Sequence, residues 1–398
     1  MTGSPQPGDE PSLPFGFGEL DLNHLLRMLQ SGGPVNWEIA AQVAHHVATD
    51  GGPEAPVDPA ATTELEELAR AAETHVVAET GLSGTFGTRV KVTGREGWAE
   101  LHLEALKPVL EALAGTLGQA FRGPGGEEAG VGPAGSPADP LAGLLPMLAP
   151  LLLGVQAGSM IGYLAQHALG RYDLPLPAAD PPSLCFVVPN LDEFEEAWSL
   201  ERSDLRFTVA LHEVVRAATR SVPWVRDRLV GLATEYVSAY EVDPAVLSER
   251  FGDLDPSNPE TLQGLAERPE ELLGAMTSAR QSALLEQLRV FHAVLEGYAD
   301  HVLGRVGGRL VGSFGQVHEA VARHRLERGE ATRFVEQLLG LTLERDDYEL
   351  GAGFCDGVVE RAGMEGLNRL WESPRMAPTG PELEAPGLWL ARIDLDLD

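Results

Sequence analysis

Four ionisable residues lie close together in the middle of the chain: His212, Glu213, Arg216 and Arg220. Their offsets of one, four and eight residues would place them on one side of an α-helix. The remaining positions from 207 to 218 are almost all apolar, so we expect this helix to be buried. Buried ionisable groups cost several kcal/mol unless they are paired or bind a metal. The stretch therefore predicts a buried polar site.

The spacing of these residues is close to the H-E-x-x-H pattern. In that pattern two histidines one helical turn apart bind zinc, and the glutamate acts on the metal-bound water. His212 and Glu213 match the pattern, but Arg216 stands where the second histidine would be. A His-Glu pair alone is a weak signal, because it also occurs at His318-Glu319 in this chain.

A second polar group lies about eighty residues further along the chain. His292, Glu296 and Asp300 recur every four residues, so they share one arc of a predicted helix. The apolar residues around them form the adjoining arc, which indicates that this helix also packs into the core. Two helices with facing polar stripes could combine their side chains into one site.

The chain resembles the actinobacterial zincin-like metallopeptidases, a family named for hydrolase activity and associated with biosynthesis of the deazaflavin coenzyme. The resemblance covers most of residues 34–374 and rests on these stretches: PVNWEIAAQVA (34–44), ALGRYDLPLP (168–177), FVVPNLDEFEEAW (186–198), LHEVVRAATRSVPWVRDRL (211–229), LEGYADHV (295–302) and LLGLTLERDDYELGAGFCDGVVERAGMEGLNRLWESP (338–374).

The resemblance implies a mainly α, zincin-like metallopeptidase fold, and we expect a minimal strand element near residues 183–189. It also implies a zinc cofactor, with His212 and Glu296 as metal ligands and Glu213 as the catalytic base. Asp300 would orient the ring of His212 through a hydrogen bond. Arg216 would stand in place of the second histidine ligand.

The possible functions differ in the role that they give to Arg216, which stands where the pattern has its second histidine. A guanidinium does not lose its proton in a protein and pairs well with carboxylates, so Arg216 could replace the metal as counter-charge to Glu213 and Glu296. The chain would then be a non-catalytic homologue that keeps the cleft. The alternatives are an active zinc hydrolase, in which His292 could serve as a relocated ligand, and a structural protein without a ligand.

The sequence also indicates the organisation of the 398-residue chain. Residues 1–20 are rich in Pro and Gly and predict a disordered tail. Residues 21–375 predict a single domain, with a mobile Gly/Pro/Ala linker at 122–139. Residues 376–398 predict a C-terminal tail.

The stretch 141–169 is apolar enough to be considered as a membrane span, but prolines and polar residues interrupt it. Its small residues would let another backbone approach closely. We therefore expect a helix in the protein core. The small residues are Gly154, Ala157, Gly158 and Gly162.

Charge and cysteine content limit the partners. The formal net charge of −31 argues against nucleic acid and against an anionic membrane surface. Two cysteines cannot staple a fold of this size, which favours a reducing cytoplasm. The resemblance implies a peptide or protein in the cleft, where the strand near 183–189 would pair with an extended chain.

Overall fold

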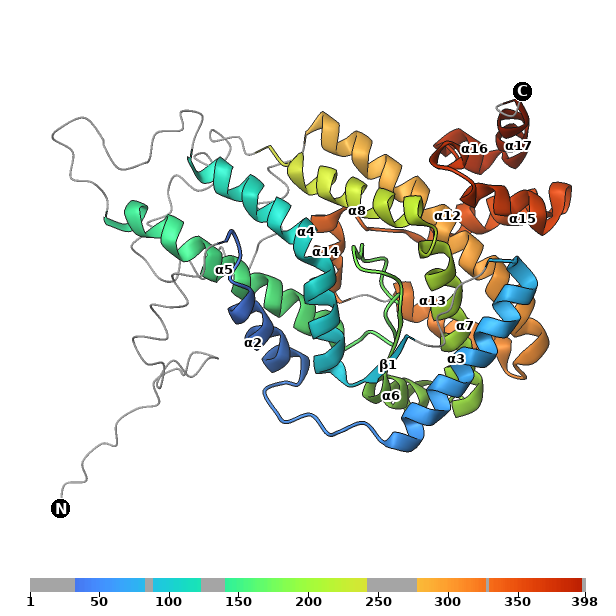
Figure 1. The fold of residues 1–398 in the computed structure, drawn as a ribbon, viewed down its shortest axis with the longest axis horizontal. Helices are drawn as coiled ribbons and strands as arrows, with labels where there is room; N and C mark the ends of the chain where they lie inside the picture. Colours follow the sequence, from blue (N-terminus) through green and yellow to red (C-terminus); the bar gives the residue numbers. More distant parts are fainter. Residues whose placement is uncertain (1–32, 83–88, 123–139, 242–277, 327–328, 396–398) are drawn as a thin grey trace, which may run out of the picture.

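The computed structural model describes residues 33–82, 89–122, 140–241, 278–326 and 329–395, and it confirms a mainly α-helical fold (Figure 1). The predicted tail at 1–20 lies outside these residues, as does the predicted linker beyond its first residue. The described elements are α2 (Trp37–Ala48), α3 (Pro59–Thr80), β1 (Val90–Thr93), α4 (Arg95–Arg122), α5 (Pro140–Ala165), β2 (Leu184–Val187), α6 (Val188–Trp198), α7 (Arg202–Arg220), α8 (Pro223–Ser238), α12 (Ala279–Leu310), α13 (Phe314–Leu326), α14 (Glu330–Leu339), α15 (Arg345–Asn368), α16 (Gly380–Glu384) and α17 (Pro386–Leu395), with short 3-10 turns at Arg369–Trp371 and Pro374–Met376.

The strand expected near 183–189 is β2, which pairs in parallel with β1. Side chains alternate across a strand, so β2 contributes to two different cores. Leu184 and Phe186 point into one core, and Cys185 and Val187 point into the other. This two-stranded unit therefore separates the two apolar clusters of the fold.

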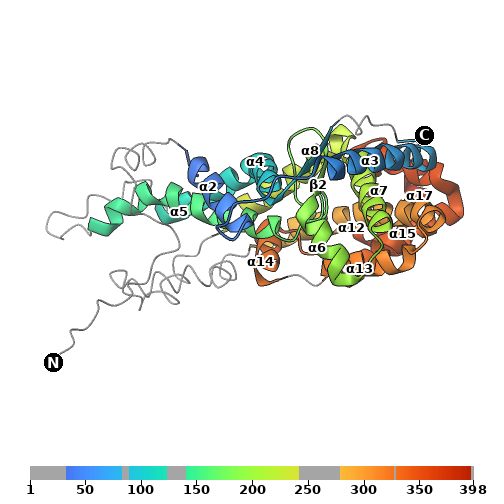
Figure 2. The ribbon, with the colours of Figure 1, turned by 90° about the horizontal axis from the view of Figure 1, so that it is seen from below.

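The first core joins α3, α7, α12 and α15, and the second joins α2, α4, α5 and α8. The two views show α2, α4 and α5 at one end of the molecule and α15 and α17 at the other (Figures 1 and 2). Helix α12 runs through both cores: Leu284 and Leu288 pack in the second, and Phe291 onward packs in the first. The apolar residues of α7 belong to the first core, so the polar stripe of α7 is also buried there.

The apolar stretch predicted as a core helix is α5, which packs on α2. A Cβ at Gly158 would lie 2.4 Å from the carbonyl oxygen of Ala40, and one at Gly162 would lie 2.7 Å from that of Ala44. The small residues therefore allow the close approach that the sequence predicts. No helix in the described part of the chain is long and apolar enough to cross a membrane.

The prediction of a C-terminal tail from residue 376 is wrong. Residues 380–395 form α16 and α17, and Trp389 and Ile393 on α17 are fully buried. Trp389 packs edge-on against Phe354 of α15, and its indole N–H donates to the carbonyl of Met376 at 2.7 Å. Burial of these apolar side chains stabilises the packing of α16 and α17 against the first core, although the prolines of this segment favoured an unstructured tail.

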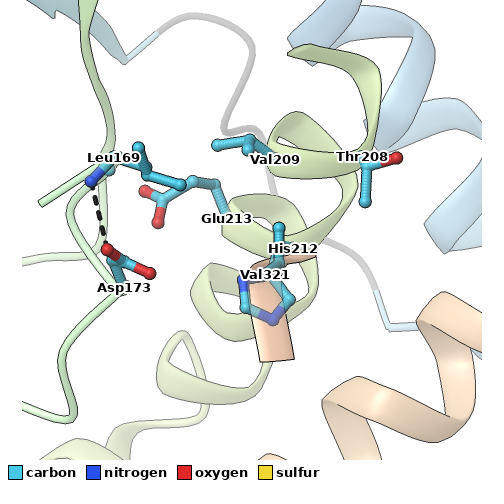
Figure 3. Close-up of a pocket in the computed structure, with 8 residues that line it drawn as sticks. Leu169, Asp173, Thr208, Val209, His212, Glu213 and Val321 are labelled. Atoms are coloured by element: carbon cyan, nitrogen blue, oxygen red, sulfur yellow. Dashed lines mark hydrogen bonds between the residues drawn. The ribbon is translucent and has the colours of Figure 1, made fainter. Parts of the chain in front are cut away.

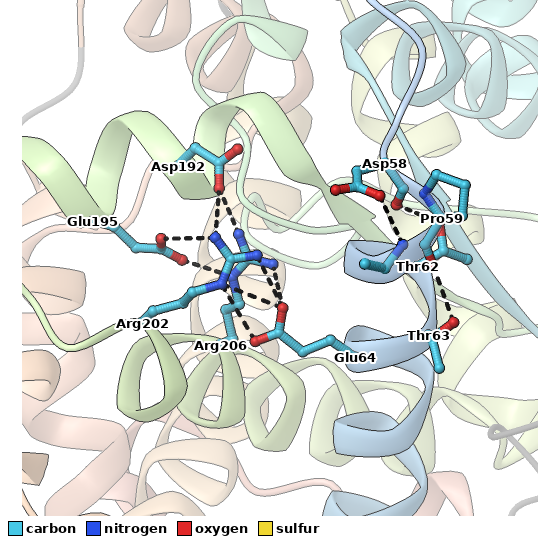
Figure 4. A network of polar contacts seen from close by, with 10 residues as sticks. Asp58, Pro59, Thr62, Thr63, Glu64, Asp192, Glu195, Arg202 and Arg206 are labelled. Carbon is cyan, nitrogen blue, oxygen red and sulfur yellow. Dashed lines mark hydrogen bonds and ion pairs between the residues drawn. The ribbon is translucent and has the colours of Figure 1, made fainter.

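A charged cluster fastens the start of α7 to two other helices (Figure 4). The fully buried guanidinium of Arg206 donates to Glu195 of α6 at 2.7 Å and to Glu64 of α3 at 3.0 Å, and it also pairs with Asp192 of α6. Arg202 reaches Glu64 as well, but its side chain is 50% exposed. The two arginines therefore share acidic partners but differ in burial.

Replacing Arg206 with methionine is expected to lower the free energy of unfolding by roughly 2 kcal/mol, because hydrogen bonds to charged groups are lost. The cost stays below that of a fully buried pair, since Glu64 and Asp192 are partly exposed and can be hydrated. Arg202→Met is the matched control, with an expected change below about 1 kcal/mol. Urea unfolding of both variants checks the difference, and equal costs would contradict it.

Candidate functional site

Helix α7 carries the predicted polar stripe and is buried from Thr208 to Arg220. It packs between α3 and α12, so the prediction that the helices of His212 and Glu296 pack together is confirmed. The side chains of His212, Glu213 and Arg216 are at most 5% exposed. Because these groups lie among apolar neighbours, they need hydrogen-bond or ionic partners within the protein.

Arg216 joins the two helices through a buried ion pair. Its Nε donates to Oε1 of Glu296 at 3.2 Å, and its Nη2 contacts the other oxygen of the same carboxylate. Its Nη1 contacts Nδ1 of His212. Because a guanidinium can donate but not accept, Nδ1 is the acceptor and the ring proton lies on Nε2. Burial, followed by the charge of Arg216, holds the pKa of His212 well below its usual range, so the ring is neutral.

The prediction that Asp300 forms a hydrogen bond with His212 is wrong. Asp300 instead accepts a bond from Arg325 of α13 at 3.1 Å, and Arg325 also reaches Glu296 at 3.5 Å. A charged guanidinium is a stronger donor to a carboxylate than a neutral imidazole, which explains the preference. Sequence reasoning missed this role of Arg325, because nothing in the local sequence of α13 indicates that the side chain reaches Glu296 and Asp300 on α12.

Glu213 is also held differently from the expectation. The charge of Arg216 acts on Glu213 as expected, but the two carboxylate oxygens also accept the backbone amides of Arg171 at 2.9 Å and Tyr172 at 2.8 Å. These amides belong to the connection between α5 and β2, which sequence reasoning did not link to the motif. Burial raises the pKa of Glu213 to about 7, against the lowering effect of the two amides and of Arg216.

A small cavity lies beside the motif (Figure 3). His212, Glu213 and Asp173 contribute polar groups to it, and Nε2 of His212 has no hydrogen-bond partner among the described residues. Its volume of about 10 Å³ is near the lower limit for one water molecule. The adjacent cavity beyond Asp173, which His324 and Arg325 help to line, measures about 60 Å³. Ligand pockets for small molecules are several times larger.

His292, the alternative ligand, lies on α12 one turn before Glu296 and is buried. In the described structure neither of its ring nitrogens has a hydrogen-bond partner. Burial, and then the charge of Arg220, lowers the pKa of His292 to about 4. The ring is therefore neutral and is not paired with the carboxylate of Glu296.

The sequence predicts that β2 can pair with an extended peptide, but both edges of β2 are already paired within the chain. Along one side β2 pairs with β1, from Val90 with Leu184 to Thr93 with Val187. Along the other side it meets residues 169–171, with an antiparallel bridge between Gly170 and Phe186. An extended peptide would find both edges of β2 already paired.

Glu296 makes the stability of the fold depend on pH. Burial alone would raise its pKa, but the charges of Arg216, Arg325 and Arg220 and the bond from Arg216 outweigh it and lower the pKa from 4.5 to about 2. A lowered acid pKa contributes stability that is present above pH 4.5 and is lost as the pH falls toward 2.

We therefore expect the stability difference between the native chain and Glu296→Gln to narrow by roughly 3 kcal/mol as the pH falls from 7 toward 2, because glutamine does not titrate. Urea midpoints measured along this range check the expectation. A difference that stays constant with pH would contradict a charged Glu296.

The fold and the site define a class of protein: a mainly α protein in which a His-Glu helix faces a second helix with a glutamate, as in zincins. The chain belongs to the zincin-like metallopeptidase family, whose model matches residues 35–390. It is also similar to a crystal structure from Chloroflexus aurantiacus called "a putative hydrolase with a novel fold". The two are 27% identical with a TM-score of 0.59, over 90% of this chain and 99% of the other. None of the curated proteins compared matches the chain.

The family implies zinc, and the residues around Arg216 do not fit that ion. The guanidinium lies between His212 and Glu296, the two side chains that would have to share a metal. Across the ranges that the structure describes, no three His, Cys, Asp or Glu side chains are grouped to hold a metal ion. A structural or catalytic zinc needs at least three protein ligands.

Proposed function

We propose that this chain is a non-catalytic member of the zincin-like family, in which the guanidinium of Arg216 takes the place of zinc. The observation that carries the proposal is the contact of Arg216 with both oxygens of Glu296 and with His212. It supplies the positive charge that a carboxylate on a buried helix requires. Without a metal, no bound water is activated, and peptide hydrolysis of the zincin type does not proceed.

The surrounding charges favour this arrangement over a metal. Arg216, Arg325 and Arg220 all act on Glu296, so three buried cations already surround one carboxylate. A zinc ion would add two positive charges to this group, and guanidinium groups cannot lose a proton to make room for it. The native site therefore opposes metal binding electrostatically as well as sterically.

An active zinc hydrolase with Glu213 as general base is the second candidate. His212, Glu213 and Glu296 are all present and lie on facing helices, and the similar Chloroflexus protein is called "a putative hydrolase". The two candidates differ in one measurable property, which is the zinc content of the native protein. In the hydrolase candidate, the family's metallopeptidase chemistry makes a peptide or protein the class of substrate.

We expect native protein purified without added zinc to hold a negligible amount of the ion, and Arg216→His to bind about one zinc per chain. In the variant the new imidazole stands one turn after His212 and forms a three-ligand set with Glu296. Zinc should also raise the melting temperature of the variant by binding the folded state. Elemental analysis and thermal unfolding with and without zinc measure both effects.

Arg216→Lys is the matched control, since it keeps a positive charge at the same position and should bind no zinc. Tightly held zinc at near-stoichiometric levels in the native protein would contradict the proposal and favour the hydrolase. An Arg216→His variant that binds no zinc would also count against it, because the remaining ligand set would then not be of the zincin type.

A further inference from the structure

The connection between α5 and β2 runs along β2 in the manner of a bound peptide. Leu169 accepts a hydrogen bond from the amide of Val187 at 3.1 Å, and the amide of Arg171 lies 3.3 Å from the carbonyl of Cys185. Between them, Gly170 and Phe186 form an antiparallel bridge. These contacts are those of strand addition, made by residues 169–172 of the chain itself. We call these residues the inner segment.

The inner segment also binds the glutamate of the motif. The amides of Arg171 and Tyr172 donate to the two oxygens of Glu213 at 2.9 and 2.8 Å. Hydrogen bonds to a carboxylate are stronger than those between neutral groups. The residue expected to act as base is consequently occupied by backbone donors from the same segment that covers β2.

Further contacts fix the inner segment at this place. The indole of Trp98 donates to the carbonyl of Gly170 at 2.8 Å, and the amide of Leu169 donates to Asp173 at 3.1 Å. A Cβ at Gly170 would lie 2.6 Å from the carboxyl carbon of Glu213, so a side chain at this position would push the segment off the glutamate. The backbone groups of the segment are bonded on β2, on Glu213 and on α4.

We propose that the inner segment occupies the position of a substrate strand between β2 and Glu213, and so closes the site to external peptides by an autoinhibitory contact within the chain. This inference rests on the proposed function, because it takes the site around His212 and Glu213 to be a zincin site that has lost its metal. It adds a second, independent block: even a metal at position 216 would leave the strand edge and the glutamate occupied.

One test uses the zinc-loaded Arg216→His variant and a mixture of internally quenched peptides. We expect no zinc-dependent cleavage, although the metal is bound. Cleavage that requires zinc and disappears with a chelator would overturn the autoinhibitory contact while leaving the metal replacement intact. Zinc in the native protein would instead contradict the proposed function, so the two failures are read from different measurements.

A second test uses the native full chain and does not depend on metal. Hydrogen exchange followed by mass spectrometry should show the amides of Arg171 and Tyr172 among the protected sites of the chain. Glu213→Gln should speed their exchange about tenfold, because an amide side chain offers one acceptor oxygen in place of two. The exposed Glu193→Gln is the control and should leave the rates unchanged.

Rapid exchange of both amides in the native protein would overturn the proposal, because the segment would then not be held on Glu213. The same holds if Glu213→Gln folds and exchanges like the native chain. If Glu213→Gln does not fold, the native exchange rates decide the question by themselves.

Discussion

Arg216→Met is expected to lower the free energy of unfolding by about 3–5 kcal/mol, because it leaves Glu296 as a buried charge without its main partner. Arg216 is 1% exposed and Glu296 2%, so water cannot replace the lost contact. Arg325 stays within 3.5 Å of Glu296 but is shared with Asp300. Urea unfolding at pH 7 measures the loss.

The double variant Arg216→Met with Glu296→Gln is the control for this result. Removing both charges should recover a large part of the lost stability, because replacing a buried ion pair by uncharged groups often changes the free energy of unfolding little. A double-mutant cycle then isolates the coupling between the two residues. Two single losses that simply add would contradict a direct pair at this site.

Gly351→Ala is expected to have the second large effect, because α12 and α15 cross with their backbones in contact. A Cβ at Gly351 would lie 1.9 Å from the carbonyl oxygen of Ala293, and one at Gly297 would lie 2.1 Å from Gly351. Backbone atoms cannot move aside as a side chain can, so the helices must separate. Overpacking of this kind costs about 1–3 kcal/mol, and we expect the upper end.

Gly353→Ala provides a control on the same helix. A Cβ at Gly353 meets no atom within 4 Å, so alanine should stabilise α15 by roughly 0.5–1 kcal/mol through its higher helix propensity. Melting temperatures of the two variants should therefore move in opposite directions. Equal shifts would show that the contact at Gly351 does not limit the packing. Glu296 precedes Gly297, so Gly351→Ala should also disturb the ion pair.

Local pattern in the sequence was sufficient for the elements of the fold. The apolar residues around His212 and Glu296 recur with helical periodicity, and both stretches form buried helices. The β-rich run near 183–189 forms β2, and the glycines of α5 allow close packing on α2. These features depend on residues that are neighbours in the chain, so their spacing alone carries the information.

The C-terminal helices show where local pattern fails. The prolines between residues 374 and 386 suggested a tail, and short helices there have weak propensity by themselves. Trp389 becomes fully buried because α15 brings Phe354 beside it. The stabilising contact therefore depends on a partner that lies outside the local sequence.

The sequence by itself determined that His212, Glu213, Arg216 and Glu296 lie on two buried helices, because helical period and apolar neighbours require it. Only the tertiary structure decided how these groups pair. Arg216 pairs with Glu296 across 80 residues, and Glu213 accepts amides from a segment 41 and 42 residues away. Ionic and hydrogen-bonded contacts require a few ångströms of separation, and those distances are set by packing between elements that are distant in sequence.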